Sequence, residues 1–237
     1  MIPIRDINPT RSFPFITILL IVANSLVFLY QAVLPAPQLE RFVFAYGVTP
    51  IEISRGVDVP PLIGVPVYLT ILTSMFMHGG WLHIIGNMLY LWVFGNNIED
   101  RFGHLRFLSI YLLWGVVAAL AQVLVNPNSR IPAVGASGAV AGVLGAYLIM
   151  FPQARVDTLV TLGIFFTTWR LPALFVIGFW ILIQFFNGFL SLDMASNEGG
   201  VAYFAHIGGA VAGLAIGLIY RLLNPSRTSY RYYGGWS

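Results

Sequence analysis

A serine between small residues is the first candidate for chemistry in this chain. It is Ser137, in the stretch Gly135-Ala136-Ser137-Gly138, and an apolar run begins right at it. The pattern predicts a short helix over 136–151, which places the hydroxyl at a helix N-terminus, where unpaired backbone N–H groups and the helix dipole favour negative charge. A developing oxyanion would be stabilised there. The alternative is a serine that only caps the helix, because serine is a preferred N-cap residue.

Polar residues in two other apolar runs complete a possible hydrolytic site. His83 and Asn87 are four residues apart, so they share one face of a helix. His206 follows about six residues into the last apolar run, roughly 9 Å along a helix axis. A serine nucleophile needs a base, which is usually histidine, and His206 is our choice. No acidic residue is placed to orient it, so we expect a Ser137–His206 dyad rather than a triad.

Hydrolysis of a peptide also needs hydrogen-bond donors for the tetrahedral oxyanion. The candidates are the backbone N–H of Ser137, the amide of Asn87 and the imidazole of His83. We give His78 a structural role and His104 an interfacial one. The alternative is that these polar groups only hydrogen-bond the helices to one another.

Other intramembrane chemistries fit the residues less well. A metalloprotease would show His-Glu-x-x-His, but the paired histidines read His78-Gly-Gly-Trp-Leu-His83. An aspartyl enzyme needs two embedded acids, and a cysteine nucleophile is excluded because the chain has no cysteine. A transporter stays open, since buried polar groups suit substrate binding, although no inverted repeat is visible. No metal, nucleotide or prosthetic group is implied.

The composition is that of an integral membrane protein. The 237 residues are 58% hydrophobic and only 9% charged, whereas soluble domains are about one-quarter charged. We predict six membrane spans of about 20 residues each, joined after the first by a long connection, 35–68, in the membrane interface. The spans are expected at 13–34, 77–98, 105–125, 136–151, 171–190 and 200–223.

The basic residues suggest an orientation. Six spans put both termini on one side of the membrane, and that side would carry nine arginines against three on the other. Such a bias places the termini in the cytoplasm. A net charge of +3 is too small and scattered to suggest nucleic acid as a partner. Residues 156–169 have no clear place in this scheme.

Spans two, four and six would then all begin at the outer face, which brings the candidate residues to a similar depth. The span beginning at Ser137 is short, so its first turn would lie below the outer surface, in contact with a water-filled cavity. Small residues spaced four apart allow close helix packing. They occur in spans four and six: Gly138, Gly142, Gly209, Gly213 and Gly217.

These motifs resemble those of the rhomboid family of intramembrane serine proteases. The matching pieces are His78…His83…Asn87, Gly135-Ala136-Ser137-Gly138 and Ala205-His206-Ile207-Gly208-Gly209…Gly213, with Glu99…Arg101…Gly103 between the first two. The resemblance implies an all-α, six-helix membrane bundle, with a cytoplasmic N-terminus (1–12), a rhomboid domain (13–223) and a cytoplasmic tail (224–237). It implies Ser137 as nucleophile, His206 as base, and an oxyanion site of His83, Asn87 and the Ser137 amide.

The same resemblance implies a substrate class. Family members cleave transmembrane segments of other membrane proteins, so the expected partners are single-span substrates and membrane lipid, in a bacterial-type inner membrane. Substrate would enter past span five, with Phe179, Trp180, Phe185 and Phe186 facing lipid or substrate. Residues 193–199 would cap the site. The alternative is a non-catalytic rhomboid-like protein that binds or escorts membrane clients. The oligomeric state, regulation and physiological substrate are not given by the sequence.

The chain departs from the family pattern in two places. Many relatives carry a Trp-Arg pair ahead of span two, where this chain has Leu69-Thr70. Some place a tyrosine four residues after the serine, stacked on the histidine, where this chain has Ala141. We therefore expect His206 to be held by glycine packing alone.

Overall fold

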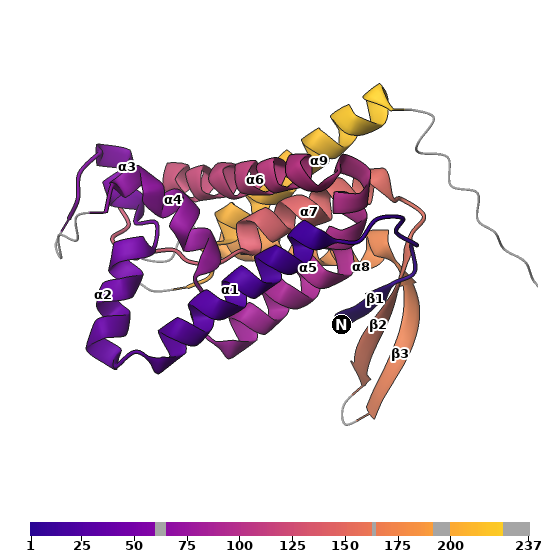
Figure 1. The fold of residues 1–237 in the computed structure, drawn as a ribbon, viewed down its shortest axis with the longest axis horizontal. Coiled ribbons are helices and arrows are strands. Elements are labelled where there is room, and N and C mark those ends of the chain that lie inside the picture. Colours follow the sequence, from indigo (N-terminus) through magenta and orange to yellow (C-terminus); the bar gives the residue numbers. More distant parts are fainter. Residues whose placement is uncertain (60–64, 163–164, 192–199, 225–237) are drawn as a thin grey trace, which may run out of the picture.

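The protein is a bundle of long helices with a small sheet at one end (Figure 1). The computed structural model describes residues 1–59, 65–162, 165–191 and 200–224. The long helices are α1 (Phe15–Val33), α5 (Trp81–Phe102), α6 (His104–Val125), α7 (Ser137–Met150), α8 (Ala173–Ser191) and α9 (Tyr203–Leu223). Shorter segments are α2 (Ala36–Tyr46), α3 (Pro50–Arg55), α4 (Thr70–Thr73) and the 3₁₀ turns Val67–Leu69 and Ser74–Phe76.

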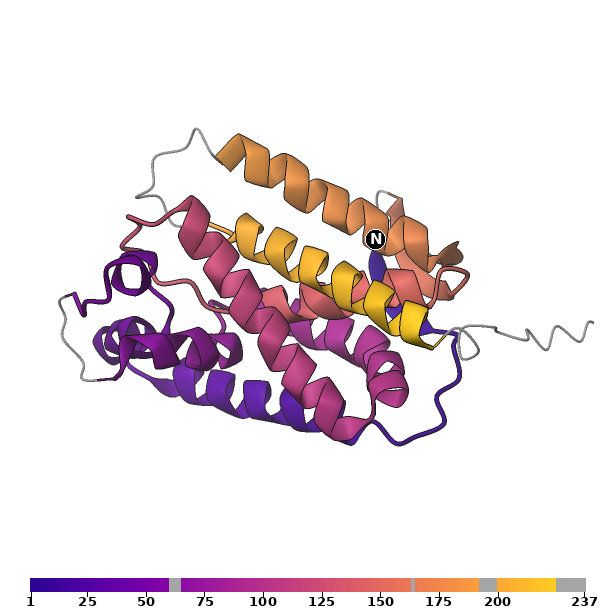
Figure 2. The same ribbon diagram turned by 90° about the horizontal axis from the view of Figure 1, so that it is seen from above.

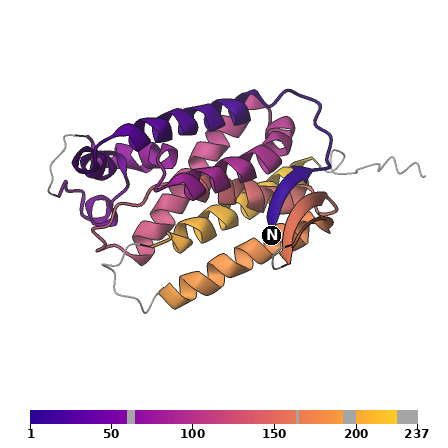
Figure 3. The same cartoon turned by 90° about the horizontal axis from the view of Figure 1, so that it is seen from below.

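Helix α7 is the centre of the bundle. It packs most extensively against α9 and also contacts α5 and α6, and nearly all of its residues are buried. Helix α8 lies at the edge, beside α9 (Figures 2 and 3). Ser137 is at the first position of α7.

Within the described residues, four helices are long and apolar enough to cross a membrane: α1, α6, α8 and α9. Six spans were expected, and the two others differ for identifiable reasons. Helix α5 has 22 residues, but the polar side chains of His83, Asn87, Asn96 and Asn97 lie within its apolar run and lower its mean hydropathy. Helix α7 has only 14 residues, short of the roughly 20 that a bilayer requires.

The expectation of an all-α chain is wrong, because the structure also has a three-stranded antiparallel sheet in the order β1-β2-β3. Strand β1 (Ile2–Asp6) comes from the predicted N-terminal tail, and β2 (Arg155–Leu162) and β3 (Phe165–Pro172) come from the segment that had no clear place. Val156, Thr158 and Val160 alternate as buried residues along β2, which is the period-two pattern of a strand with one buried face.

The connection predicted over 35–68 also contains regular structure. Helices α2 and α3 occupy much of it, and proline near the first position of each suits the start of a helix. Val48 pairs with Ala133 in an isolated bridge. This pairing joins the connection to the segment that leads into Ser137.

The contact between α7 and α9 depends on glycine. A Cβ on Gly209 or Gly213 would lie 2.0 Å from the carbonyl oxygen of Gly138 or Gly142 respectively. Neither oxygen can move without displacing the backbone of α7. The two helices therefore approach more closely than any side chain would permit, and this fixes the relative positions of Ser137 and His206.

Buried carboxylates join the elements at the end of the bundle opposite Ser137. Glu99 is fully buried and accepts hydrogen bonds from the backbone N–H groups of Ile16 and Thr17 (2.8 Å each) and from the Thr17 hydroxyl. It also contacts His104, to which only an interfacial role was given. Glu99 thus satisfies the first turn of α1, where backbone donors have no partner within the helix.

Asp6 forms a second such junction. Its carboxylate accepts hydrogen bonds from Asn97 of α5 (2.5 Å) and from the backbone N–H of Asn8 (2.9 Å). The Asn8 amide in turn donates to the Tyr147 hydroxyl on α7 at 2.8 Å. Burial raises the pKa of Asp6 to about 6, although hydrogen bonds from Asn8, Tyr147 and Ile7 oppose that rise.

Candidate active site

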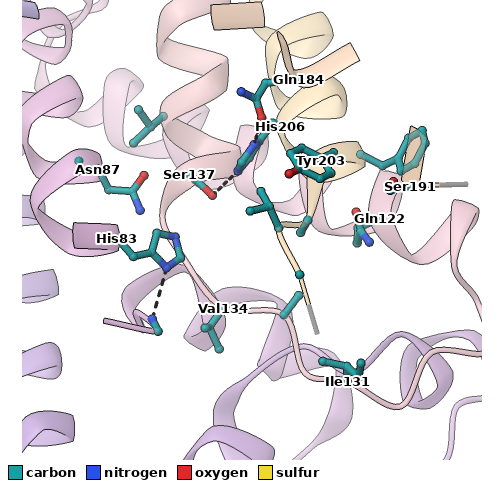
Figure 4. Close-up of a pocket in the computed structure, with 18 of the residues that line it drawn as sticks. His83, Asn87, Gln122, Ile131, Val134, Ser137, Gln184, Ser191, Tyr203 and His206 are labelled. Atoms are coloured by element: carbon teal, nitrogen blue, oxygen red, sulfur yellow. Dashed lines mark hydrogen bonds between the residues drawn. The ribbon is translucent and has the colours of Figure 1, made fainter. Parts of the chain in front are cut away.

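The structure brings Ser137 and His206 together across the contact between α7 and α9 (Figure 4). Ser137 Oγ lies 2.8 Å from His206 Nε2, although the two residues are 69 positions apart in the chain. The imidazole is only 8% exposed. A hydroxyl and a ring nitrogen at this distance share a hydrogen bond, and this is the arrangement that a serine nucleophile and its base require.

Ser137 does not cap its helix. The N-cap of α7 is Ala136, and no side chain caps the helix end. The hydroxyl is therefore available to His206. Gly135, just before it, has a φ of +137°, a conformation that favours glycine. A side chain at this position would also displace the His83 imidazole, because a Cβ would lie 2.8 Å from His83 Nε2.

Gln184 of α8 completes the surroundings of the imidazole. Its Oε1 lies 2.7 Å from His206 Nδ1, and the residue is 7% exposed. The Trp180 ring, one turn earlier on α8, packs at 5.5 Å from the His206 ring. The expectation that glycine packing alone holds His206 is therefore wrong. Sequence reasoning missed Gln184, although it is an unusual amide within an apolar helix.

His83 and Asn87 face Ser137 from α5, on the side opposite His206 (Figure 4). His83 Nδ1 accepts a hydrogen bond from the backbone N–H of Gly79 at 3.3 Å, which leaves Nε2 to carry the proton. That nitrogen and Ser137 Oγ both flank the position of a Cβ at Gly135. Asn87 Nδ2 is buried and has no hydrogen-bond partner within the described residues. Both side chains thus offer a free donor beside the hydroxyl.

His78 is buried, and both of its ring nitrogens are without a hydrogen-bond partner in the described part of the chain. Its ring packs edge-on to His83 at 5.1 Å. Its backbone N–H donates to Gln31 of α1 at 3.0 Å. His78 therefore supports the start of α5 and the position of His83.

A cavity of about 1130 Å³ opens onto these residues. Its polar lining comes from α5 to α9 and from the connection between α6 and α7, and includes Gln122, Asn126 and Ser129 in addition to Ser137, His206, His83, Asn87 and Gln184. Its volume is sufficient for an extended peptide segment. Polar groups in such a space can be solvated, which a helix surface facing lipid does not allow.

The structure also places several other residues named in the sequence analysis. Phe179, Phe185 and Phe186 of α8 are exposed on the outside of the bundle, as expected, whereas Trp180 lines the cavity. Leu69 is exposed and Thr70 is buried. The proposed cap, 193–199, and the tail after 224 lie outside the described residues. Among those that are described, no three histidines or acids are grouped as metal ligands would be.

Two features define the kind of protein. It has several helices long and apolar enough to cross a membrane, and a serine and a histidine share a hydrogen bond between two of its helices. Residues 66–222 match the model of the rhomboid domain, which is more than half of the chain. The chain belongs to the rhomboid family. This agrees with the resemblance found in its motifs.

Relatives of this chain occur in several kingdoms. It is 33% identical over 148 residues to "Rhomboid protease GluP" of Bacillus subtilis, covering 62% of this chain and 26% of the relative. It is 29% identical over 153 residues to "Rhomboid protein 1, mitochondrial" of Saccharomyces cerevisiae, covering 63% and 41%. It is also 33% identical over 149 residues to "RHOMBOID-like protein 6, mitochondrial" of Arabidopsis thaliana, covering 63% and 42%.

The chain spans less than half the length of these relatives. Two of them are named as mitochondrial and one comes from a bacterium. The likeness therefore assigns the family and a membrane-embedded, multi-pass architecture, but no particular membrane.

Proposed function

We propose that this protein is an intramembrane serine endopeptidase that cleaves transmembrane segments of other membrane proteins. The observation that carries the proposal is the 2.8 Å contact between Ser137 Oγ and His206 Nε2 inside a polar cavity. A polar pair inside a membrane protein is costly and usually functional. The name of the Bacillus subtilis relative, a rhomboid protease, supports the same reaction.

His206 acts as the base in the first step. Nε2 takes the Ser137 proton as Oγ attacks the substrate carbonyl carbon, and the carbonyl oxygen becomes an oxyanion. His206 then gives that proton to the leaving nitrogen, and the peptide bond breaks to leave an acyl-serine. Water, deprotonated by His206, attacks the acyl carbon, and the serine hydroxyl is restored.

Three donors are available for the oxyanion: the Ser137 backbone N–H, Asn87 Nδ2 and the imidazole of His83. The Asn87 amide supports this role because it is buried without a partner, so an oxyanion would satisfy it. Removing one donor of an oxyanion site typically costs 10²–10³ in rate. Because no acid contacts His206 in the described residues, the array is a dyad in its charges.

The substrates are proposed to be single-span proteins that enter from lipid past α8, where Phe179, Phe185 and Phe186 are exposed. A transmembrane helix must unwind before its backbone reaches Ser137. We therefore expect substrates with glycine, proline or small polar residues near the cleaved bond. In our proposed topology α5 and α7 complete six spans, with both termini in the cytoplasm of a bacterial-type membrane and cleavage near the outer face.

The test is cleavage of a model single-span substrate in liposomes. The wild type should release two fragments, and Ser137→Ala and His206→Ala should each lose about 10⁴-fold or more in activity. A fluorophosphonate should label the wild type, but neither variant. Ser109→Ala is the matched control, because in the described residues the Ser109 hydroxyl donates to the Leu105 carbonyl on its own helix, α6.

Equal cleavage by Ser137→Ala would contradict the proposal of a serine protease. A wild type that neither cleaves nor reacts, yet retains a transmembrane client in pull-down, would identify the non-catalytic alternative.

A further inference from the structure

We propose that Gln184 is a positioning residue for the catalytic base, and that α8 must be packed against α9 for His206 to be oriented. This inference rests on the proposed function. It adds a third member to the dyad and assigns that member to the helix at the edge of the bundle.

The hydrogen-bond geometry sets the proton positions on the imidazole. Gln184 Oε1 lies 2.7 Å from His206 Nδ1, and an amide oxygen can only accept. Nδ1 must therefore carry the ring proton in the neutral histidine. Nε2 is then unprotonated and can accept the proton of Ser137 Oγ, 2.8 Å away. With the other tautomer Nδ1 and Gln184 Oε1 would be two acceptors facing each other, and Nε2–H would donate to Ser137 Oγ, so Ser137 would have no base.

The identity of this Gln184 atom follows from its surroundings. The Gln184 Nε2 donates to the Trp180 carbonyl within α8 at 3.3 Å, which directs Oε1 toward the imidazole. Both residues are one turn apart on α8, and the Trp180 ring lies against the imidazole at 5.5 Å. Helix α8 thus contributes one hydrogen-bond acceptor and one aromatic face to the support of His206.

This support comes from outside the tight α7–α9 contact. Helix α8 contacts α9 far less extensively than α7 does, and its outer surface is a row of exposed apolar side chains. If α8 moves away from α9, His206 keeps its place on α9 but loses the acceptor that selects its tautomer. Packing of α8 therefore controls whether His206 holds the tautomer in which Nε2 can accept a proton, in addition to any effect on the entry of substrate.

The first experiment removes the acceptor. Gln184→Leu keeps the side-chain size, and we expect kcat to fall about 10- to 100-fold with little change in KM, because only orientation of the base is lost. Gln184→Glu restores an acceptor and adds a negative charge beside Nδ1. We expect it to recover most of kcat and to move the acidic limb of the pH profile to higher pH, since a carboxylate favours protonated histidine.

Asn187→Leu is the matched control, an amide-to-apolar change on the same helix that should leave kcat within about twofold. A Gln184→Leu enzyme with wild-type kcat, or a Gln184→Glu enzyme with an unshifted profile, would overturn the positioning role. A purely structural residue would lower thermal stability without shifting the pH profile.

A readout that does not need activity comes from ¹⁵N NMR of the histidines, of which the chain has only four. His206, assigned from its absence in His206→Ala, should show a protonated Nδ1 in the wild type and lose that preference in Gln184→Leu. A wild type protonated on Nε2 contradicts the inference. If the tautomer behaves as described but no substrate is cleaved, the proposed function fails while the hydrogen bond stands.

The second experiment fixes α8 in place. A Cβ at Gly188 would lie 3.4 Å from Tyr203 Cβ on α9, close to the ~3.8 Å separation of the Cβ atoms in disulfides. The chain has no cysteine of its own, so Gly188→Cys with Tyr203→Cys can form a single defined cross-link. The oxidised protein should react with a small fluorophosphonate at least as fast as the same protein after reduction. Slower labelling in the cross-linked form would show that docked α8 does not orient the base.

Discussion

Helices α7 and α8 both contact the same imidazole, yet they are packed in opposite ways. Helix α7 is buried on nearly all sides and meets α9 through glycine, with no space for a side chain between Gly213 and the Gly142 carbonyl. Helix α8 exposes a row of large apolar residues, and a Cβ at Gly178 would meet nothing within 4 Å. Ser137 and His206 are thus positioned by a close contact between backbones, and Gln184, the proposed positioning residue for His206, by a looser one.

This difference separates two requirements of the chemistry. The distance between Ser137 and His206 has to be constant, and close packing of backbones provides that constancy. Entry of the proposed helical substrate requires an element that can be displaced, and α8 contacts α9 far less extensively than α7 does. The site combines both because Gln184 reaches from the looser helix to the rigid pair.

The largest effect is expected where the rigid contact is broken. In Gly213→Val the new Cβ would lie 2.0 Å from the Gly142 oxygen, so α9 has to move away from α7. We expect a loss of about 3 kcal/mol or more in stability and the loss of fluorophosphonate labelling. Thermal unfolding in detergent, followed with labelling at a permissive temperature, measures both. Unchanged stability would mean that the two helices do not meet as described.

An intermediate effect is expected at Asp6 of β1. This residue connects the small sheet to helices α5 and α7. The pKa of Asp6 is raised to about 6 by burial, so the folded state holds the proton more tightly than the unfolded chain. The stability from this group is fully present below pH ~4 and is lost as pH rises through about 6. The loss is on the order of 2 kcal/mol, because one pKa unit corresponds to about 1.4 kcal/mol and the site is only partly enclosed.

Asp6→Asn mimics the protonated carboxyl and isolates this contribution. The melting temperature of the variant, compared with the wild type at each pH, should gain steadily between pH 4 and 6 and level off above. A wild type that gains on the variant as pH rises would show that the carboxylate is stabilised in its charged form, contrary to the effect of burial.

The smallest effect is expected at Gly178 of α8. Nothing lies within 4 Å of the added methyl group, and alanine favours a helix over glycine by about 1 kcal/mol at most. Gly178→Ala should therefore raise the melting temperature slightly and leave kcat within about twofold. A large loss of stability would place another element against this face of α8, and the comparison between the two helices would fail.

The sequence led to the choice of Ser137 and His206 because a membrane protein holds few polar side chains. Four histidines could be weighed one by one, and Ser137 sits at the start of an apolar run. The structure places Ser137, His206, His83 and Asn87 around one cavity. Their catalytic roles stay predictions until the variants are measured.

Gln184 was missed because an amide in an apolar helix does not by itself indicate a role, and its partner is 22 residues away on another helix. The sheet was missed for a related reason. Strand β1 pairs with β2 across about 150 residues of chain, and its five residues alternate too weakly to predict a strand alone. The short helix α7 was predicted from its apolar run at nearly its observed bounds, whereas the polar residues within α5 lower its hydropathy as a span.

Because β3 continues directly into α8, the sheet holds the N-terminus of this helix in place. Strand β3 ends at Pro172 and the helix begins at Ala173, whose N–H donates to the Ala154 carbonyl at 2.8 Å. A tilt of α8 would therefore turn about this end of the helix. At 1.5 Å per residue Gln184 lies roughly 17 Å along the helix axis from Ala173, so a tilt of about 10° would carry it about 3 Å sideways. A displacement of that size would break the hydrogen bond between Gln184 and His206. A slight tilt of α8 is therefore enough to separate the two side chains.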